Sequence, residues 1–395
     1  MDRDTVNENV LNLSDKYKNI LIELPTGMGK TLVALNILDR HYKENYNILI
    51  VIPRNVLINS WKEEFKKWEM EDYLSNVTFT TYVSLPKHEG KWDMIIFDEC
   101  HHLSERCREA LTNFNIDRAV LLSATVKKEM KDEFNEIFDD IYKYKVRMKE
   151  AIENEVLPDP RVFLLPLTLN TSLPTEVIIK NPKGKSPIIE TSWANRWSYI
   201  KQKVYKVKIY CSEWQYYQDL DSQIEWFKNK YMRSRNDVYK SKWLRLAGDR
   251  LKWLSDKKIN TIKSIKEHCK NERTLIFCNS IEQTEIIGNC INSKLKQSID
   301  NLDRFNKGKI NQISAVNMLN EGCNLTNCRI GVYGNLNSSE IIVKQRLGRI
   351  LRHKDPIIII PYYKNTREEE LVSKMLLDYN PELIKTVSSI KEIIL

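Results

Sequence analysis

Hydrophobic residues in the first part of the chain form short continuous runs, separated by segments of helical periodicity. Four such runs precede residue 130, at 20–22, 48–52, 94–97 and 120–122. Continuous apolar runs are typical of strands buried on both faces of a parallel sheet. Between residues 56 and 68, apolar positions recur at spacings of four, four and three, which predicts a helix with one buried face. Residues 1–145 are therefore predicted to form an α/β lobe.

The same layered pattern returns in the second half of the chain. Prolines at 158 and 160 interrupt it, and the lobe boundary is expected near 145–160. Further apolar runs follow, at 162–165, 274–278, 329–334 and 356–360. These runs predict a second α/β lobe over residues 146–395. Residues 171–192 are rich in prolines and are expected to form an exposed loop.

A stretch at about 193–260 interrupts the second lobe and is rich in aromatic and basic residues. It contains five tryptophans between Trp193 and Trp243 and many lysines and arginines. Aromatic rings with cations could stack bases and neutralise phosphates. The favoured interpretation for most of these rings is a helical insertion in which the aromatics form their own core.

Composition limits the classes of protein to consider. The chain has 395 residues, 42% hydrophobic and 29% charged, with a net charge of +9, which allows two or three domains and a polyanionic partner. It has no apolar stretch of membrane-spanning length and no apolar signal region at its start. Eight cysteines without a C-x-x-C pair favour a reducing compartment. The expected location is the cytoplasm of a bacterial or phage-infected cell, with the nucleus as the alternative, and no membrane partner is expected.

The strongest candidate for chemistry is the loop between the first apolar run and the helix predicted after it. Its sequence is Pro25-Thr26-Gly27-Met28-Gly29-Lys30-Thr31. In a strand–loop–helix of this kind, backbone N–H groups converge on phosphate oxygens. The lysine reaches the β- and γ-phosphates of a nucleotide, and the threonine hydroxyl ligates Mg²⁺. The alternative is an ordinary turn in which this sequence arose by chance.

Two further strand ends carry polar side chains. Asp98 and Glu99 follow the apolar run 94–97, where carboxylates are costly unless a cation or a proton-transfer role compensates. Asp98 is predicted to hold Mg²⁺ and Glu99 to polarise the attacking water; a helix cap is the alternative. Ser123 and Thr125 end the next run and could hydrogen-bond to the acidic pair or to His101. A zinc site at Cys100-His101-His102 with Cys107 is disfavoured, because the spacing matches no standard site.

A basic segment lies between the last two predicted strands of the second lobe. Gln345, Arg349 and Arg352 fall at i, i+4 and i+7, so a helix would present them on one polar face. Guanidinium groups fixed on a packed helix can clamp an anion. A solvated basic face is the alternative.

Taken in order, these segments resemble the motifs of a superfamily 2 helicase. LPTGMGKT resembles motif I, VIPRNVLINSW motif Ia, DECHH motif II and SAT motif III. LIFCNS is similar to motif IV, NEGCNL to motif V and QRLGRILR to motif VI. Within the superfamily, the chain looks like the DNA-translocating group that includes restriction-type ATPase subunits, compact phage helicases and the xeroderma pigmentosum group B type.

The resemblance implies two RecA-like lobes with ATP and Mg²⁺ at their cleft and nucleic acid across both. Gln345, Arg349 and Arg352 would complete the ATP site from the second lobe, the two arginines as arginine fingers. His101, Ser123 and Thr125 would couple nucleotide state to the rest of the chain. Residues in motifs that usually contact the nucleic-acid backbone are Pro53, Arg54, Thr81, Gly322 and Asn324.

The function expected from this resemblance is an ATP-dependent helicase or translocase acting on DNA in preference to RNA. No glutamine precedes Gln202, so the adenine-reading glutamine of many relatives is missing and base selectivity stays open. The alternatives are an RNA helicase or remodeller with the same engine, and a nucleotide-switched clamp that is a subunit of a larger complex. A small-molecule kinase would explain the phosphate loop without the basic segment. Protein partners are not predicted.

Overall fold

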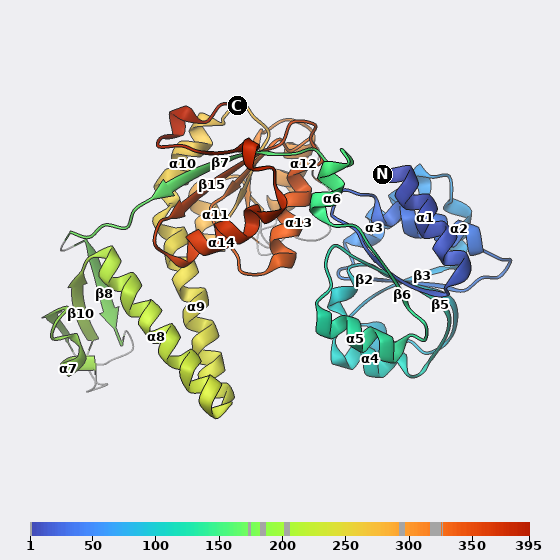
Figure 1. The fold of residues 1–395 in the computed structure, drawn as a ribbon, viewed down its shortest axis with the longest axis horizontal. Coiled ribbons are helices and arrows are strands. Elements are labelled where there is room, and N and C mark those ends of the chain that lie inside the picture. The colour runs from blue at the N-terminus through green and yellow to red at the C-terminus, as the bar shows by residue number, and fades with distance from the viewer. Residues whose placement is uncertain are drawn as a thin grey trace.

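The computed structural model describes residues 2–172, 175–181, 187–200, 206–291, 297–316, 325 and 327–395. Two α/β lobes, each built on a parallel sheet, lie side by side, and a smaller sheet with a long helical hairpin extends from the second (Figure 1). The predicted pair of parallel-sheet lobes is therefore confirmed, and the insertion in the second contains the expected helices together with a sheet that was not expected. No helix in the described ranges has the length and apolar character needed to cross a membrane.

Lobe 1 is a six-stranded parallel sheet in the order β3-β2-β4-β5-β1-β6. Its strands are β1 (Asn19–Glu23), β2 (Ile48–Ile52), β3 (Val77–Thr81), β4 (Gly90–Phe97), β5 (Phe114–Ser123) and β6 (Tyr142–Lys145). Its helices are α1 (Arg3–Lys16), α2 (Lys30–His41), α3 (Leu57–Lys67), α4 (Glu105–Leu111) and α5 (Lys128–Ile137). All five residues of β2 are buried, as its continuous apolar run predicts.

Lobe 2 is a seven-stranded parallel sheet in the order β12-β13-β11-β14-β15-β7-β16. Its strands are β7 (Arg161–Leu167), β11 (Thr274–Phe277), β12 (Cys290–Ile291), β13 (Gln312–Ala315), β14 (Ile330–Tyr333), β15 (Ile357–Tyr363) and β16 (Ile384–Thr386). Its helices are α10 (Ile259–His268), α11 (Ile281–Ile287), α12 (Gln297–Asn306), α13 (Glu340–Ile350) and α14 (Arg367–Met375). The chain crosses from lobe 1 to lobe 2 through the short helix α6 (Met148–Glu153).

The insertion combines a three-stranded sheet with two long helices. Its elements are β8 (Glu176–Lys180), β9 (Ile188–Ser192), α7 (Arg196–Ile200), β10 (Lys206–Cys211), α8 (Glu213–Ser234) and α9 (Asp237–Lys257). The central strand β10 pairs antiparallel with β8 and parallel with β9. The expectation of a loop over 171–192 is therefore wrong, because pairing with β10 orders two strands within it.

The two lobes contact each other where α13 reaches lobe 1. Leu351, at the end of α13, is 1% exposed and packs into the hydrophobic core cluster of lobe 1. Gly348 approaches Thr26 so closely that a Cβ at this glycine would lie 2.1 Å from the Thr26 Cβ. The fold thus brings the basic segment of lobe 2 against the glycine-containing loop of lobe 1.

Candidate active site

The loop between β1 and α2 has the conformation that a phosphate-binding turn requires. Gly27 and Gly29 have φ values of +98° and +82°. Residues other than glycine rarely adopt this backbone region. Gly29 is the N-cap of α2, so the N-terminal N–H groups of this helix open toward the loop. Lys30 and Thr31 are the first two residues of α2. The loop residues Pro25 and Met28 close it with a backbone hydrogen bond of 3.2 Å.

Lys30 reaches back across this loop toward the acidic pair. Its Nζ donates a hydrogen bond to the Leu24 carbonyl at 3.2 Å and lies 4.0 Å from Oε1 of Glu99. Glu99 follows β4 and adopts a left-handed backbone conformation with φ +52°, which is uncommon outside glycine. The structure therefore brings Lys30, Thr31, Asp98 and Glu99 to one edge of the sheet.

The two carboxylates of the pair have opposite pKa shifts. Burial and the charge of Glu99 raise the pKa of Asp98 to about 6, although the indole of Trp61 donates a hydrogen bond to its Oδ2 at 3.0 Å. Burial would also raise the pKa of Glu99, but the Lys30 ammonium and the imidazole of His101 outweigh it and lower that pKa to about 2. Glu99 is thus held ionised, as an acceptor for a water proton must be.

The residues expected to couple nucleotide state outward lie together behind Glu99. His101, in the 3₁₀ turn Cys100–His102, has its Nδ1 3.0 Å from the Ser123 Oγ and 3.4 Å from Oε2 of Glu99. The Ser123 hydroxyl donates in turn to the Thr125 carbonyl at 3.0 Å. A continuous polar path therefore runs from the acidic pair to the end of β5.

The expected nucleic-acid contacts of lobe 1 share the carboxyl ends of β2 and β3. Ile52 pairs with Thr81, so Pro53 and Arg54 emerge next to it, and Arg54 is exposed. Between this edge and the acidic pair lies Tyr82, whose hydroxyl donates to the Asp98 carbonyl at 2.7 Å. Gly322 and Asn324, the other predicted contacts, lie outside the described residues.

On lobe 2, Gln345 and Arg349 of the predicted basic face lie on helix α13, whereas Arg352 follows the end of this helix at Ile350 and is not on it. Gln345 and Arg349 are buried. Arg352 is exposed and lies close enough to Glu64 of α3 for their charges to interact. Beside this contact, a cavity of about 690 Å³ opens between the lobes, lined among others by Pro25 and Leu347.

The residues at this contact fit a nucleotide with its magnesium ion. The Thr26 hydroxyl in lobe 1 and the Gln345 amide nitrogen in lobe 2 are buried without a hydrogen-bond partner, and buried polar atoms normally have one. Within the described ranges, no three His, Cys, Asp or Glu side chains gather as a metal site. Magnesium sites commonly need one or two carboxylates, with phosphate oxygens and water supplying the other ligands.

Reasoning from the sequence missed four residues of this region. Trp61, placed by its spacing on a core face, also contacts Asp98. Tyr82 connects the expected nucleic-acid contacts to the acidic pair. Gly348 allows the close approach of the lobes, and its position inside QRLGRILR is the only sequence signal for that role. Arg346 turns into lobe 2, where it donates to the Asn335 carbonyl at 2.9 Å.

Comparison with known proteins matches two parts of the chain to family profiles. The profile described as "Type III restriction enzyme, res subunit" matches residues 2–128, and that described as "Helicase conserved C-terminal domain" matches residues 257–354. The DNA 3'-5' translocase XPB2 of Sulfurisphaera tokodaii is 39% identical over 101 residues, which cover 22% of each chain. Together, these matches support a superfamily 2 helicase of the restriction and XPB type.

A second curated relative matches over a similar length of this chain. The ATP-dependent DNA helicase Hel308 of Pyrococcus horikoshii is 31% identical over 142 residues, covering 28% of this chain and 20% of Hel308. The matches thus span about a fifth of the length of these two curated relatives. Among solved structures, Saccharomyces cerevisiae Dbp5 bound to RNA and ADP BeF3 has a TM-score of 0.62 at 11% identity, covering 97% of this chain and 89% of Dbp5. That likeness shows a shared two-lobe fold.

Proposed function

We propose that this chain is an ATP-dependent DNA helicase or translocase that couples ATP hydrolysis between its two lobes to movement along nucleic acid. The observation that carries the proposal is the contact of Gly348 with Thr26. It places the helix that bears Arg349 directly against the glycine-containing loop. A helix from one lobe that contacts the phosphate loop of the other is the arrangement that lets hydrolysis and lobe movement depend on each other.

The proposed roles follow from the positions of the side chains. The loop 25–29 and Lys30 hold the phosphates of ATP, and Thr31 and Asp98 hold Mg²⁺, which would neutralise charge on those phosphates. Glu99, kept ionised by Lys30 and His101, orients the attacking water. Gln345, Arg349 and Arg352 contribute from lobe 2, and an arginine at such a position accelerates phosphoryl transfer by about 10³–10⁵.

A structural connection between the expected nucleic-acid contacts and the proposed ATP site supports coupled movement of the two. Thr81 and Tyr82 are adjacent at the end of β3, and Tyr82 donates to the backbone of Asp98. A displacement of the expected nucleic-acid contacts at this edge would therefore move the metal-binding carboxylate. His101, Ser123 and Thr125 form the second polar path away from Glu99.

DNA is proposed as the nucleic acid in preference to RNA. The names of two relatives describe a DNA translocase and a DNA helicase. The likeness to the RNA-bound Dbp5, at 11% identity, supports the shared fold and does not favour RNA. An RNA remodeller with the same two-lobe engine is the alternative that the following experiment separates.

The test measures ATPase rates of the wild-type chain alone and with single-stranded, duplex, forked and branched DNA and with RNA. We expect DNA to increase the rate more than RNA does. Arg349→Ala is expected to lower the stimulated rate by about 10³-fold or more. Arg304→Ala, an exposed arginine on α12, is the matched control and should retain the rate.

Two results would contradict the proposal. If no nucleic acid stimulates the ATPase, the chain is not a helicase or translocase that couples hydrolysis to movement along nucleic acid. A stimulated rate that survives Arg349→Ala unchanged would mean that α13 does not complete the hydrolysis site. Stronger stimulation by RNA than by every DNA would instead favour the RNA remodeller.

A further inference from the structure

The helical hairpin of the insertion carries an unusual concentration of positive charge. We define the hairpin tip as residues 226–245, the end of α8 and the beginning of α9. The tip contains seven lysines and arginines and one acidic residue, a net charge of +6 against +9 for the whole chain. The basic residues are Lys228, Lys230, Arg233, Arg235, Lys240, Lys242 and Arg245. Figure 1 shows this tip projecting away from lobe 2.

The charges of the tip are directed at solvent. Six of its seven basic residues are exposed, Lys228 being the exception. Lys228 is also the member of the set that pairs with a carboxylate among the described residues, with its Nζ 3.1 Å from Oε1 of Glu225. Solvated cations without nearby carboxylates repel one another, and a polyanion relieves that repulsion.

The aromatic residues of the tip organise these cations. Trp226 packs edge-on against Phe227 and Tyr239, with ring centroids 4.8 and 6.2 Å away. The ammonium groups of Lys230 and Lys242 lie 5.4 Å from the ring centroids of Trp226 and Phe227, respectively. Trp226 is 51% exposed, but the Lys230 ammonium over its ring competes with an unpaired base for that face. The tip therefore suits phosphates rather than bases.

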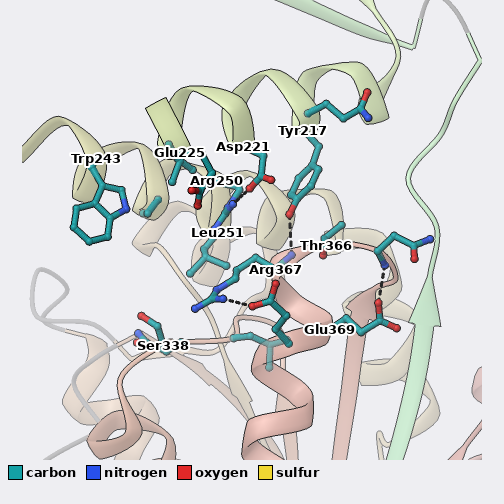
Figure 2. Close-up of a pocket in the computed structure, with 18 of the residues that line it drawn as sticks. Tyr217, Asp221, Glu225, Trp243, Arg250, Leu251, Ser338, Thr366, Arg367 and Glu369 are labelled. Carbon is teal, nitrogen blue, oxygen red and sulfur yellow. Dashed lines mark hydrogen bonds and ion pairs between the residues drawn. The ribbon is translucent and has the colours of Figure 1, made fainter. Parts of the chain in front are cut away.

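The base of the hairpin is fixed to lobe 2. Figure 2 shows Tyr217 and Arg250 facing the start of α14 across a cavity of about 980 Å³. The Tyr217 hydroxyl accepts a hydrogen bond from the Arg367 backbone at 2.8 Å. Arg250 and Arg367 are each paired with a carboxylate, Asp221 and Glu370 respectively. The arginines at the base are thus neutralised, whereas the tip is held out at a fixed position.

We propose that the hairpin tip binds the sugar–phosphate backbone of duplex nucleic acid, beside the strand on which the two lobes act. The inference rests on the proposed function and adds a second contact surface to it. Helix α8 has 22 residues and is about 33 Å long at the usual rise, so the tip extends well beyond the lobe. A duplex hides its bases and presents phosphates outward, which matches a surface with six exposed cations.

The experiment compares two triple variants of the full chain. Lys230→Gln, Lys240→Gln and Lys242→Gln together remove three charges from the tip. Lys270→Gln, Lys307→Gln and Lys385→Gln remove three exposed lysines elsewhere on lobe 2 and form the matched control. Binding of a labelled duplex with a single-stranded tail, and of that tail alone, is measured by fluorescence anisotropy over a series of salt concentrations.

We expect the tip variant to bind the tailed duplex at least tenfold more weakly than the control, with less than twofold difference for the tail alone. The slope of log affinity against log salt should fall by about 2 to 3, since each phosphate contact contributes about 0.9. Arginine at the same three positions should restore the affinity. Thermal unfolding of each variant at the wild-type temperature verifies that the fold is retained.

The outcomes separate this inference from the proposed function. Equal affinity of the tip and control variants for the tailed duplex would overturn the inference, while nucleic-acid stimulation of the wild-type ATPase would still support the proposed function. A weakening as large for the tail alone as for the tailed duplex would overturn the assignment to duplex. If nucleic acid does not stimulate the ATPase of the wild-type chain, the proposed function is wrong. The binding comparison would still decide whether the tip binds duplex nucleic acid.

Discussion

Asp98 and Glu99 are adjacent in the sequence, yet the protein assigns them different protonation behaviour. Burial and the Glu99 charge raise the pKa of Asp98 to about 6. The Lys30 ammonium and His101 overcome burial and lower the pKa of Glu99 to about 2. Glu99 is therefore a carboxylate at any physiological pH, whereas Asp98 carries a proton in a growing fraction of molecules as the pH falls below 6, and a cation that binds it must displace that proton.

This difference predicts how magnesium binding depends on pH. Below pH 6, Mg²⁺ must displace the proton of Asp98, so its apparent affinity should fall up to tenfold per pH unit, and above pH 6 it should level off. Trp61→Phe removes a hydrogen bond that lowers this pKa and should move the transition to higher pH. Titration of Mg²⁺ against a fluorescent nucleotide between pH 5 and 8 measures both effects.

The control for this titration is Trp197→Phe, because Trp197 is an exposed residue of α7 in the insertion, away from the acidic pair. It should leave the transition where the wild type has it. An affinity for Mg²⁺ that stays constant from pH 5 to 8 would contradict a role for Asp98 as a ligand that titrates in this range.

At the scale of single residues, the sequence predicted which types of side chain form the site, but it did not predict the contacts between side chains that are distant in sequence. The apolar run 94–97 followed by two carboxylates predicted an acidic pair at a strand end, and the structure has it there. The bond from Trp61 to Asp98 spans 37 residues and joins a helix to a strand. The spacing of Trp61 assigns it to a buried face and says nothing about which polar group its indole meets.

At the scale of the element, helix α13 carries two buried arginines, Arg346 and Arg349, that face different surroundings. Arg346 is 1% exposed and lies over the Phe277 ring, 5.0 Å from its centroid. Burial lowers the pKa of its guanidinium, yet it donates to the Asn335 carbonyl at 2.9 Å. Arg346 thus fixes the rotation of α13 on lobe 2, and that rotation sets where Arg349, three residues later, is presented.

Substitution of the two arginines should separate these roles. Arg346→Ala leaves the Asn335 carbonyl without its donor and a cavity beside Phe277, so the free energy of unfolding should fall by about 3 kcal/mol. Arg349→Ala should lower it much less while abolishing the stimulated ATPase. Urea denaturation and ATPase rates measure the two effects, and equal losses of stability would mean that Arg346 does not position the helix.

Most strands of the two lobes were predictable because each is an apolar run buried on both faces. All seven residues of β15 are buried, and a run of isoleucines indicates this directly. Strands β8 and β9 alternate between half-buried and exposed residues within a proline-containing segment. Their order comes from pairing with β10, a contact distant in sequence, so the local pattern indicated a loop instead.

At the scale of the whole molecule, the order of the motifs predicted that two lobes would share a cleft, but it could not predict how near they lie. That separation depends on a few contacts between separately packed cores. Gly348 meets Thr26, and Leu351 enters the core cluster of lobe 1. A glycine or a leucine in or next to a helix is common, so the residue type alone does not indicate a contact between lobes.

Leu351 should therefore hold the lobes together before any ligand binds. Leu351→Ala removes buried apolar surface from the contact between them, and we expect a larger radius of gyration by small-angle X-ray scattering without nucleotide. Leu275→Ala, on β11 in the core cluster of lobe 2, is the matched control and should lower the stability of that lobe by about 2–5 kcal/mol without opening the cleft. An unchanged radius for Leu351→Ala, with a loss of stability like that of Leu275→Ala, would show that this leucine stabilises a lobe rather than the closed arrangement.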